Sequence, residues 1–261
     1  MSTLKNARIL RVLISKDLKM IAANVSSIII DCIPPLIVQV TTFGYLFPLL
    51  GTPSAMIAPT YLGSMTSLLF HLGYAFVLKT SFNLEHDRFI DYHLTLPIPK
   101  RWLFASFIIN HMLEVAIVTL PLFTIGVGLL HTHFNLAAIS WLGIAIVYPL
   151  ILAYFSTFFL AFSYSLSLSW IMANSWPRIL APMWWIGATL VVWKKVYLWQ
   201  PWIAYCMLLN PITYAAEGIR AAFLGNQDFI PWPLCAVMLS IFIVFNCVCL
   251  VYGVKKRLDP V

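Results

Sequence analysis

Long apolar runs separated by short polar or charged breaks dominate this sequence. Most of these runs reach the roughly 20 mostly apolar residues that a helix needs to cross a bilayer. The breaks carry Pro, Gly, Asn or clustered charge, which are typical of helix ends and turns. The pattern predicts an all-α polytopic membrane protein with six transmembrane helices. We expect the spans at about residues 24–48, 58–79, 102–130, 137–165, 179–198 and 233–253.

Two further segments are too charged or too interrupted to cross. Residues 1–22 mix apolar positions with five basic residues, which predicts an amphipathic helix lying at an anionic membrane surface. Residues 199–230, between the fifth and sixth spans, are apolar but broken by Pro, Gly and charge. We therefore expect short re-entrant helices there, a form that is tolerated in a membrane where protein surrounds it.

The clearest of these helices has a signal at each end. Asn210 can cap it, with Pro211 at its first position, and Gly225 can end it. The resulting helix of about 211–224 spans only about two-thirds of the hydrocarbon thickness at ~1.5 Å per residue. In the first span, the pair at 34–35, Pro-Pro, predicts a kink.

Composition narrows the class of protein. The 261 residues are 61% hydrophobic and only 10% charged, and mean hydropathy is +0.89. A water-soluble domain carries about a quarter charged residues, so a soluble enzyme and a disordered protein are excluded. Little chain remains outside the spans, so we expect one transmembrane domain over residues 1–261.

The basic residues indicate orientation rather than nucleic-acid binding. The net charge is +7, but Lys and Arg cluster at the edges of the apolar runs. With the N-terminus inside, every basic residue except Lys194, Lys195 and Arg220 falls on the cytoplasmic side. The positive-inside rule then predicts a cytoplasmic (inner) membrane protein with both termini in the cytoplasm.

Sequence motifs for catalysis or metal binding are missing. There is no GxxxxGK[ST], HExxH or GxSxG pattern, and the five cysteines lie in apolar surroundings without a CxxC pair. We therefore predict no catalytic residues, no metal site and no cofactor of its own. Any dependence on ATP and Mg²⁺ must come from a partner subunit.

The charged loop over residues 80–101 is the main candidate for contact with a soluble partner. A short amphipathic helix beginning at Asn83 would carry Glu85, Asp87, Arg88 and Asp91 on one polar stripe. Charge combined with apolar anchors would fix a partner's orientation. The alternative interpretation is a solvated loop.

Two carboxylates and two tryptophans mark a hypothetical substrate path. Asp31 and Glu114 lie inside spans, where a charge must face protein or a cavity. Glu114 shares a helical face with His111 and suits either a path or proton relay, or a hydrogen-bonded structural role. Trp184 and Trp185 offer stacking faces for sugar rings or flat apolar ligands, or simply pack between helices.

Residues 210–225, just before the last span, read NPITYAAEGIRAAFLG. This stretch resembles the C-terminal signature of type-2 ABC exporter permeases. The layout also resembles that family: a basic N-terminal helix, six spans, and a charged loop between the second and third that ends in Leu-Thr-Leu-Pro97.

The resemblance implies a half-transporter that forms a homodimer and pairs with ATP-binding cassette subunits. It implies that the stretch from Glu85 to Asp91 docks on that subunit, and that Glu217 and Arg220 pair on the re-entrant helix. Similar permeases export polysaccharides, lipid-linked glycans or drugs. Two alternatives remain from the residues: a proton-coupled carrier using Asp31 and Glu114, and an integral membrane enzyme using Glu114 with His111.

Overall fold

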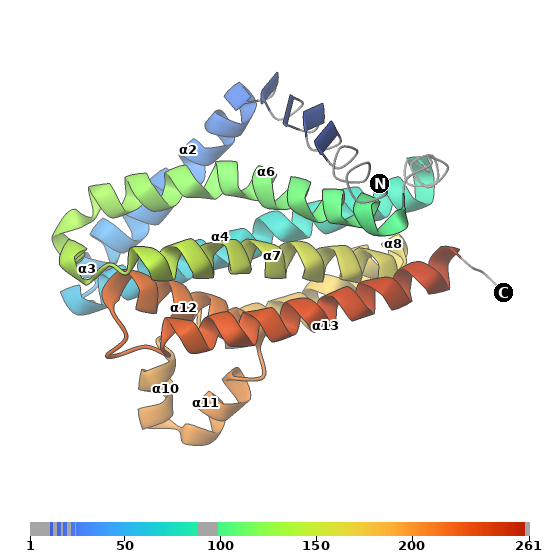
Figure 1. Ribbon diagram of the computed structural model, residues 1–261. Coiled ribbons are helices and arrows are strands. Elements are labelled where there is room, and N and C mark those ends of the chain that lie inside the picture. Colours follow the sequence, from blue (N-terminus) through green and yellow to red (C-terminus); the bar gives the residue numbers. More distant parts are fainter. Residues whose placement is uncertain are drawn as a thin grey trace.

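The computed structural model describes residues 11–12, 15–16, 18–19, 22–23, 25–87 and 99–258. All regular structure in these ranges is helical, and the long helices run side by side in an elongated bundle (Figure 1). The elements are α2 (Val25–Thr41), η1 (Thr42–Leu46), α3 (Phe47–Leu49), α4 (Ser54–Phe82), η2 (Asn83–Asp87), α6 (Lys100–Leu129), η3 (His131–His133), η4 (Leu136–Ala138), α7 (Trp141–Ser165), α8 (Leu168–Trp170), η5 (Ile171–Leu180), α9 (Ala181–Ile186), α10 (Trp193–Trp199), α11 (Pro201–Met207), α12 (Pro211–Leu224) and α13 (Trp232–Leu258).

Four helices in the described ranges are long and apolar enough to cross a membrane. They confirm the helices predicted for the second, third, fourth and last spans. The second span is longer than expected, because α4 continues into η2. The four segments are Ser54–His86, Lys100–Leu129, Trp141–Ser165 and Trp232–Lys256.

Helix α7 forms the centre of the bundle. It packs against α4, α6, α12 and α13, and its Tyr154, Phe155 and Phe159 side chains are almost fully buried. By contrast, α13 keeps large apolar side chains such as Val237, Ile241 and Val244 exposed along its outward side. An apolar outer surface of this extent is typical of helices that face lipid.

The first predicted span is also helical. Helical backbone runs from Val25 to Leu49 through α2, the π-helical η1 and α3, and the two prolines at 34–35 lie inside α2. Its described apolar part, Ile33–Leu49, is shorter than the four candidate spans. Crossing of the membrane by this segment stays a prediction.

The bounds predicted for the fifth span, 179–198, are wrong. A continuous helical segment runs instead from Leu168 to Ile186 through α8, η5 and α9, and residues 187–192 leave the helix. The segment starts early because the hydroxyl of Ser167 accepts the amide of Trp170. The polar residues 174–178, which the sequence places between the fourth and fifth spans, lie within the π-helical η5. The number of spans therefore stays a prediction.

The helix predicted to start at Asn83 is also different in the structure. Asn83 does not cap the N-terminus of a helix, because helical backbone continues from α4 through it into η2. Arg88, Asp91 and most of the 80–101 loop lie outside the described residues, as does most of the predicted interfacial helix 1–22. The loop ends where α6 begins after Pro99.

Candidate functional site

The helix predicted over 211–224 is present as α12 with the same bounds, and its re-entrant placement in the membrane stays a prediction. The Asn210 side chain accepts the amide of Ile212 at 3.1 Å, and Gly225 ends the helix at a φ of 92°. The helix is buried from Pro211 to Ala222, and it packs against α4, α7 and α13. Protein therefore encloses α12 on nearly every side.

Glu217 and Arg220 form an ion pair in the middle of this buried helix. Arg220 Nη1 donates to Glu217 Oε1 at 2.9 Å, and both side chains are 0% exposed. Two charges removed from water remain stable only when their remaining donors and acceptors are also paired. The predicted contact between these two residues is present, one helical turn apart.

Backbone carbonyls satisfy the rest of the Arg220 guanidinium. Its Nε donates to Pro59 O at 2.8 Å, in the first turns of α4. Its terminal nitrogens donate to Ala188 O at 2.6 Å, Thr189 O at 2.8 Å and Val191 O at 3.2 Å. These last three carbonyls can accept from Arg220 because residues 187–192 are not helical. The three hydrogen bonds in turn stabilise the break in the helix predicted over 179–198.

The Glu217 carboxylate holds two further segments. Its Oε1 accepts the amide of Trp193 at 3.0 Å, at the start of α10. Its Oε2 accepts the amide of Ile230 at 3.3 Å, just before α13. The Glu217–Arg220 pair therefore connects α4, the 187–192 segment, α10 and the entrance to α13 through one buried cluster.

The close approach of α4 to this cluster requires a glycine. A Cβ atom on Gly63 would lie 1.9 Å from Thr189 O and 2.1 Å from Arg220 Nη2. No side chain fits there without displacing either the backbone or the guanidinium. Gly63 thus belongs to the site, although sequence reasoning did not find it.

At the opposite end of the bundle, Glu85 joins two helical segments. Its Oε1 accepts the amide of Leu168 at 2.9 Å, where α8 begins. Asp87 lies in the same π-helical turn, η2, as Glu85. The other two predicted partner-contact residues, Arg88 and Asp91, lie outside the described residues.

The two predicted tryptophans have different surroundings. Trp184 packs against α4, where its indole N–H donates to Ser67 and its ring lies 5.6 Å from His71. The Trp185 ring lies 4.7 Å from that of Trp184, and its side chain is exposed. Trp184 therefore holds α9 against α4, and Trp185 faces away from the bundle.

A row of polar residues on α4 accompanies Trp184, and sequence reasoning missed it. Ser64, Ser67 and His71 follow the i, i+3, i+7 spacing of one helical face. The Ser64 hydroxyl donates to Gln39 Oε1 of α2 at 2.6 Å. The signal was present in the sequence as polar residues at helical spacing inside an apolar run.

Glu114 and His111 lie one turn apart on α6 and make no hydrogen bond to each other. His111 Nδ1 lies 2.8 Å from Ser156 Oγ of α7, and its Nε2 has no partner within the described ranges. Glu114 is half-buried on α6 and makes no hydrogen bond or ion pair to a described residue. Asp31 lies in α2, which packs on α6.

No group of three or more His, Cys, Asp or Glu side chains able to hold a metal ion occurs in the part of the chain that the structure describes. Comparisons with models of known protein families, with curated proteins and with solved structures find no match. The fold itself defines the class: a multi-pass, α-helical membrane protein.

We expect Arg220→Met to lower the melting temperature of the detergent-solubilised protein strongly. The change leaves Glu217 as an unpaired buried charge and removes the donor to four carbonyls, a loss of about 3–5 kcal/mol. The matched control is Lys194→Met, which breaks the exposed ion pair of Lys194 with Asp228 and should cost about 0–1 kcal/mol. Equal melting temperatures for the two variants would contradict the role given to Arg220.

We expect Gly63→Ala to disturb the same cluster without altering any charge. The added methyl group has no room between Thr189 and Arg220, so the melting temperature should fall. The control is Gly128→Ala in α6, where a Cβ atom meets nothing within 4 Å and alanine favours the helix by about 0.5–1 kcal/mol. A thermal melt in which Gly63→Ala matches Gly128→Ala would show that the close approach is unimportant.

Proposed function

We propose that the chain is the membrane-spanning permease subunit of an ATP-driven exporter, acting as a homodimer with a separate ATP-binding cassette subunit. The observation that carries this proposal is the buried helix α12 with its Glu217–Arg220 pair. It coincides with the stretch whose sequence resembles the C-terminal signature of type-2 ABC exporter permeases. In this proposal the permease has no catalytic residues and no cofactor, because the partner binds ATP and Mg²⁺ and hydrolyses the ATP.

The contacts of Glu85 support a route for movement along the bundle. A partner that pushes on η2 would act on α4 directly and, through Glu85 and the amide of Leu168, on the helical segment from α8 to α9. That segment ends at Ile186, immediately before the carbonyls that Arg220 binds. Displacement at one end would therefore reach the Glu217–Arg220 pair at the other.

The arrangement of the two ends supports the expected orientation. In Figure 1 the end of α4, the start of α8 and the C-terminal end of α13 lie together at the right-hand end of the bundle, and α3 and α12 lie towards the other. A cytoplasmic C-terminus thus fits with a cytoplasmic Glu85. We place the chain in the cytoplasmic (inner) membrane with both termini in the cytoplasm and six crossings.

The polar row on α4 supports an amphiphilic substrate. Ser64 and Ser67 are buried, with their hydroxyls bonded to Gln39 and Trp184, whereas His71 is exposed and Trp185 offers an exposed aromatic face. Such a combination suits a glycan, a glycolipid or a drug-like molecule, since sugars and flat rings stack on indoles while hydroxyls pair with polar side chains. We propose that this face, completed by a second copy, lines the outward path.

No contact among the described residues favours either the membrane enzyme or the proton-coupled carrier. The integral membrane enzyme needs Glu114 and His111 at one centre, but His111 engages Ser156. The proton-coupled carrier, with Asp31 and Glu114 on the packed helices α2 and α6, requires no ATPase. Purification from the native membrane therefore distinguishes the two hypotheses, because only an exporter should be recovered with an ATP-binding subunit.

The proposal is tested by solubilising the chain from its native membrane and assaying the purified material for a second subunit. We expect a stoichiometric ATP-binding subunit and vanadate-sensitive ATPase activity. Recovery of the chain alone, without ATPase activity, would overturn the exporter proposal and leave the carrier.

In the same preparation, Glu85→Lys should lower the amount of ATP-binding subunit recovered by about tenfold or more, because it reverses a charge at the proposed contact. The matched control is Asp228→Lys, the same reversal at an exposed acid near the other end of the bundle, which should leave recovery unchanged. If both variants retain the partner equally, η2 is not the docking element.

A further inference from the structure

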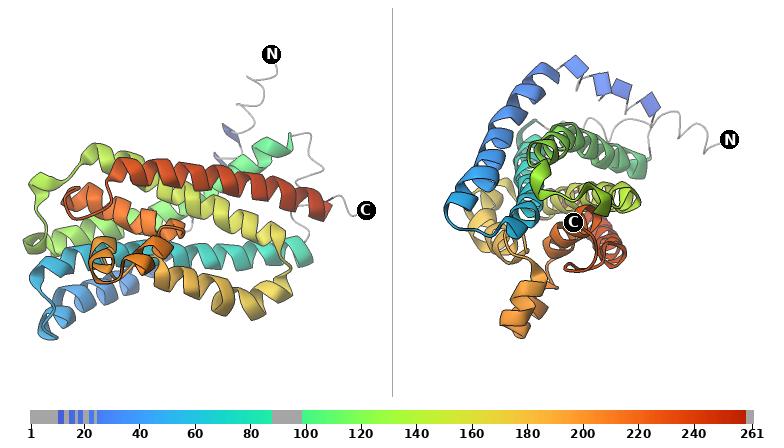
Figure 2. Two further views of the ribbon diagram at one scale, coloured as in Figure 1. Left: turned by 90° about the horizontal axis from the view of Figure 1, so that it is seen from below. Right: turned by 90° about the vertical axis from the view of Figure 1, so that its left-hand side faces the viewer.

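Helices α10 and α11 form a small hairpin that projects from the side of the bundle (Figures 1 and 2). The indole N–H of Trp193 donates to Ala204 O at 2.8 Å and joins the two helices. The rings of Tyr197 and Tyr205 meet edge to face, with centroids 5.8 Å apart. These contacts give the hairpin an internal structure of its own.

The outward side of the hairpin is apolar and uncovered. Trp199, Trp202 and Leu209 are 72%, 66% and 80% exposed, and Leu198 and Tyr205 are also exposed. Soluble proteins rarely leave such large apolar side chains together in water. A medium other than water must therefore surround this side of the hairpin.

The position of the hairpin indicates which medium this is. Both views show it beside the early part of α13 rather than beyond the end of the bundle. Trp185 of α9 and Leu234 of α13 are exposed apolar residues, as are those on the outward side of the hairpin. A segment that lies beside spanning helices, rather than beyond their ends, is within one leaflet of the membrane. Within a leaflet, Trp and Tyr are enriched near the membrane–water boundary.

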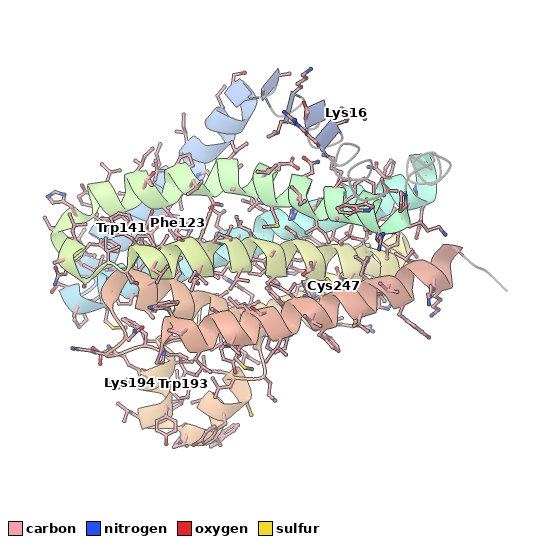
Figure 3. The ribbon with its side chains drawn as sticks, in the orientation of Figure 1. Lys16, Phe123, Trp141, Trp193, Lys194 and Cys247 are labelled. Carbon is pink, nitrogen blue, oxygen red and sulfur yellow. The ribbon has the colours of Figure 1, made fainter. Side chains whose placement is uncertain are left out.

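Two lysines, Lys194 and Lys195, lie at the start of α10, at the base of the hairpin. Lys194 and Trp193 lie where α10 meets the bundle (Figure 3), and Lys194 pairs with Asp228 at 2.9 Å. Lys195 is exposed, its ammonium rests against the sulfur of Met56, and no described carboxylate pairs with it. A lysine next to an aromatic surface complements the phosphate of an anionic lipid.

We infer that the α10–α11 hairpin is a docking surface for anionic phospholipid in the leaflet at the α12 end of the bundle. Its aromatic side lies at the boundary between headgroups and acyl chains, and Lys195 lies at the level of the phosphates. The amide of Trp193 binds Glu217, so this lipid contact acts directly on the buried ion pair. The inference rests on the membrane class of the fold and not on the proposed exporter function.

The native cysteine of α11 provides the test. Cys206 is exposed and lies one helical turn after Trp202 in α11, on the same face of that helix. In a chain whose other four cysteines are replaced by alanine, Cys206 is labelled with an NBD fluorophore and the protein is placed in lipid nanodiscs. Quenching is compared between lipids carrying a nitroxide near the headgroup, lipids carrying one deep in the acyl chain, and iodide in water.

We expect the headgroup-proximal nitroxide to quench the Cys206 label most strongly. Two controls bracket the result: a label at His131→Cys, in the exposed turn after α6, and one at Val244→Cys, on the exposed side of α13. Iodide quenching of Cys206 equal to that at His131→Cys would place the hairpin in water and overturn the inference. Protection from every quencher would indicate that protein, such as a second copy, covers it, and would overturn it equally.

A second comparison tests whether the hairpin prefers an anionic lipid. Nitroxide-labelled phosphatidylglycerol should quench the Cys206 label at least twofold more than labelled phosphatidylcholine, and Lys195→Glu should abolish this difference. Because Lys195 is exposed at the surface, the variant should keep the melting temperature of its parent. Equal quenching by the two lipids in the parent protein would show that Lys195 selects no anionic headgroup.

Discussion

The hydrogen bonds of Arg220 determine how the α12 end of the bundle is assembled. A guanidinium without access to water must find acceptors for its N–H groups, or its burial costs several kcal/mol. Here Glu217 and four carbonyls serve that purpose, and three of those carbonyls exist as free acceptors only because the chain leaves the helix after Ile186. The absence of a side chain at Gly63 lets α4 approach closely enough to supply the fourth.

This cluster also accounts for the position of the segments around it. Glu217 accepts the amides that begin α10 and precede α13, so the lipid-facing hairpin and the last span share one carboxylate. At the far end, Glu85 ties α4 to the segment that leads into the same cluster. Buried polar clusters of this kind have few alternative arrangements, because any unpaired group is expensive. Movement should therefore occur as a shift of whole helices between satisfied arrangements.

The sequence alone predicted the elements whose signals are local. Helical length and apolar pattern located four spans, and Asn210, Pro211 and Gly225 fixed both ends of α12. It failed where contacts distant in sequence overrule the local pattern. The break after Ile186 depends on Arg220, which lies more than thirty residues later, and the apolar run over 179–198 carries no sign of it. Helical continuity through Asn83 likewise overrides a good capping residue. The pair of Glu217 with Arg220 could be predicted from spacing and resemblance, but its carbonyl partners could not.

Hydrogen–deuterium exchange followed by mass spectrometry, on the wild-type chain and Arg220→Met in nanodiscs, tests most directly whether one ion pair holds this end together. Peptides covering 187–193 and 225–231 should lose protection together in the variant, because both segments depend on the cluster. Peptides from the centre of α7 should be unchanged. Loss of protection confined to α12, with both other segments as protected as in the wild type, would contradict the account.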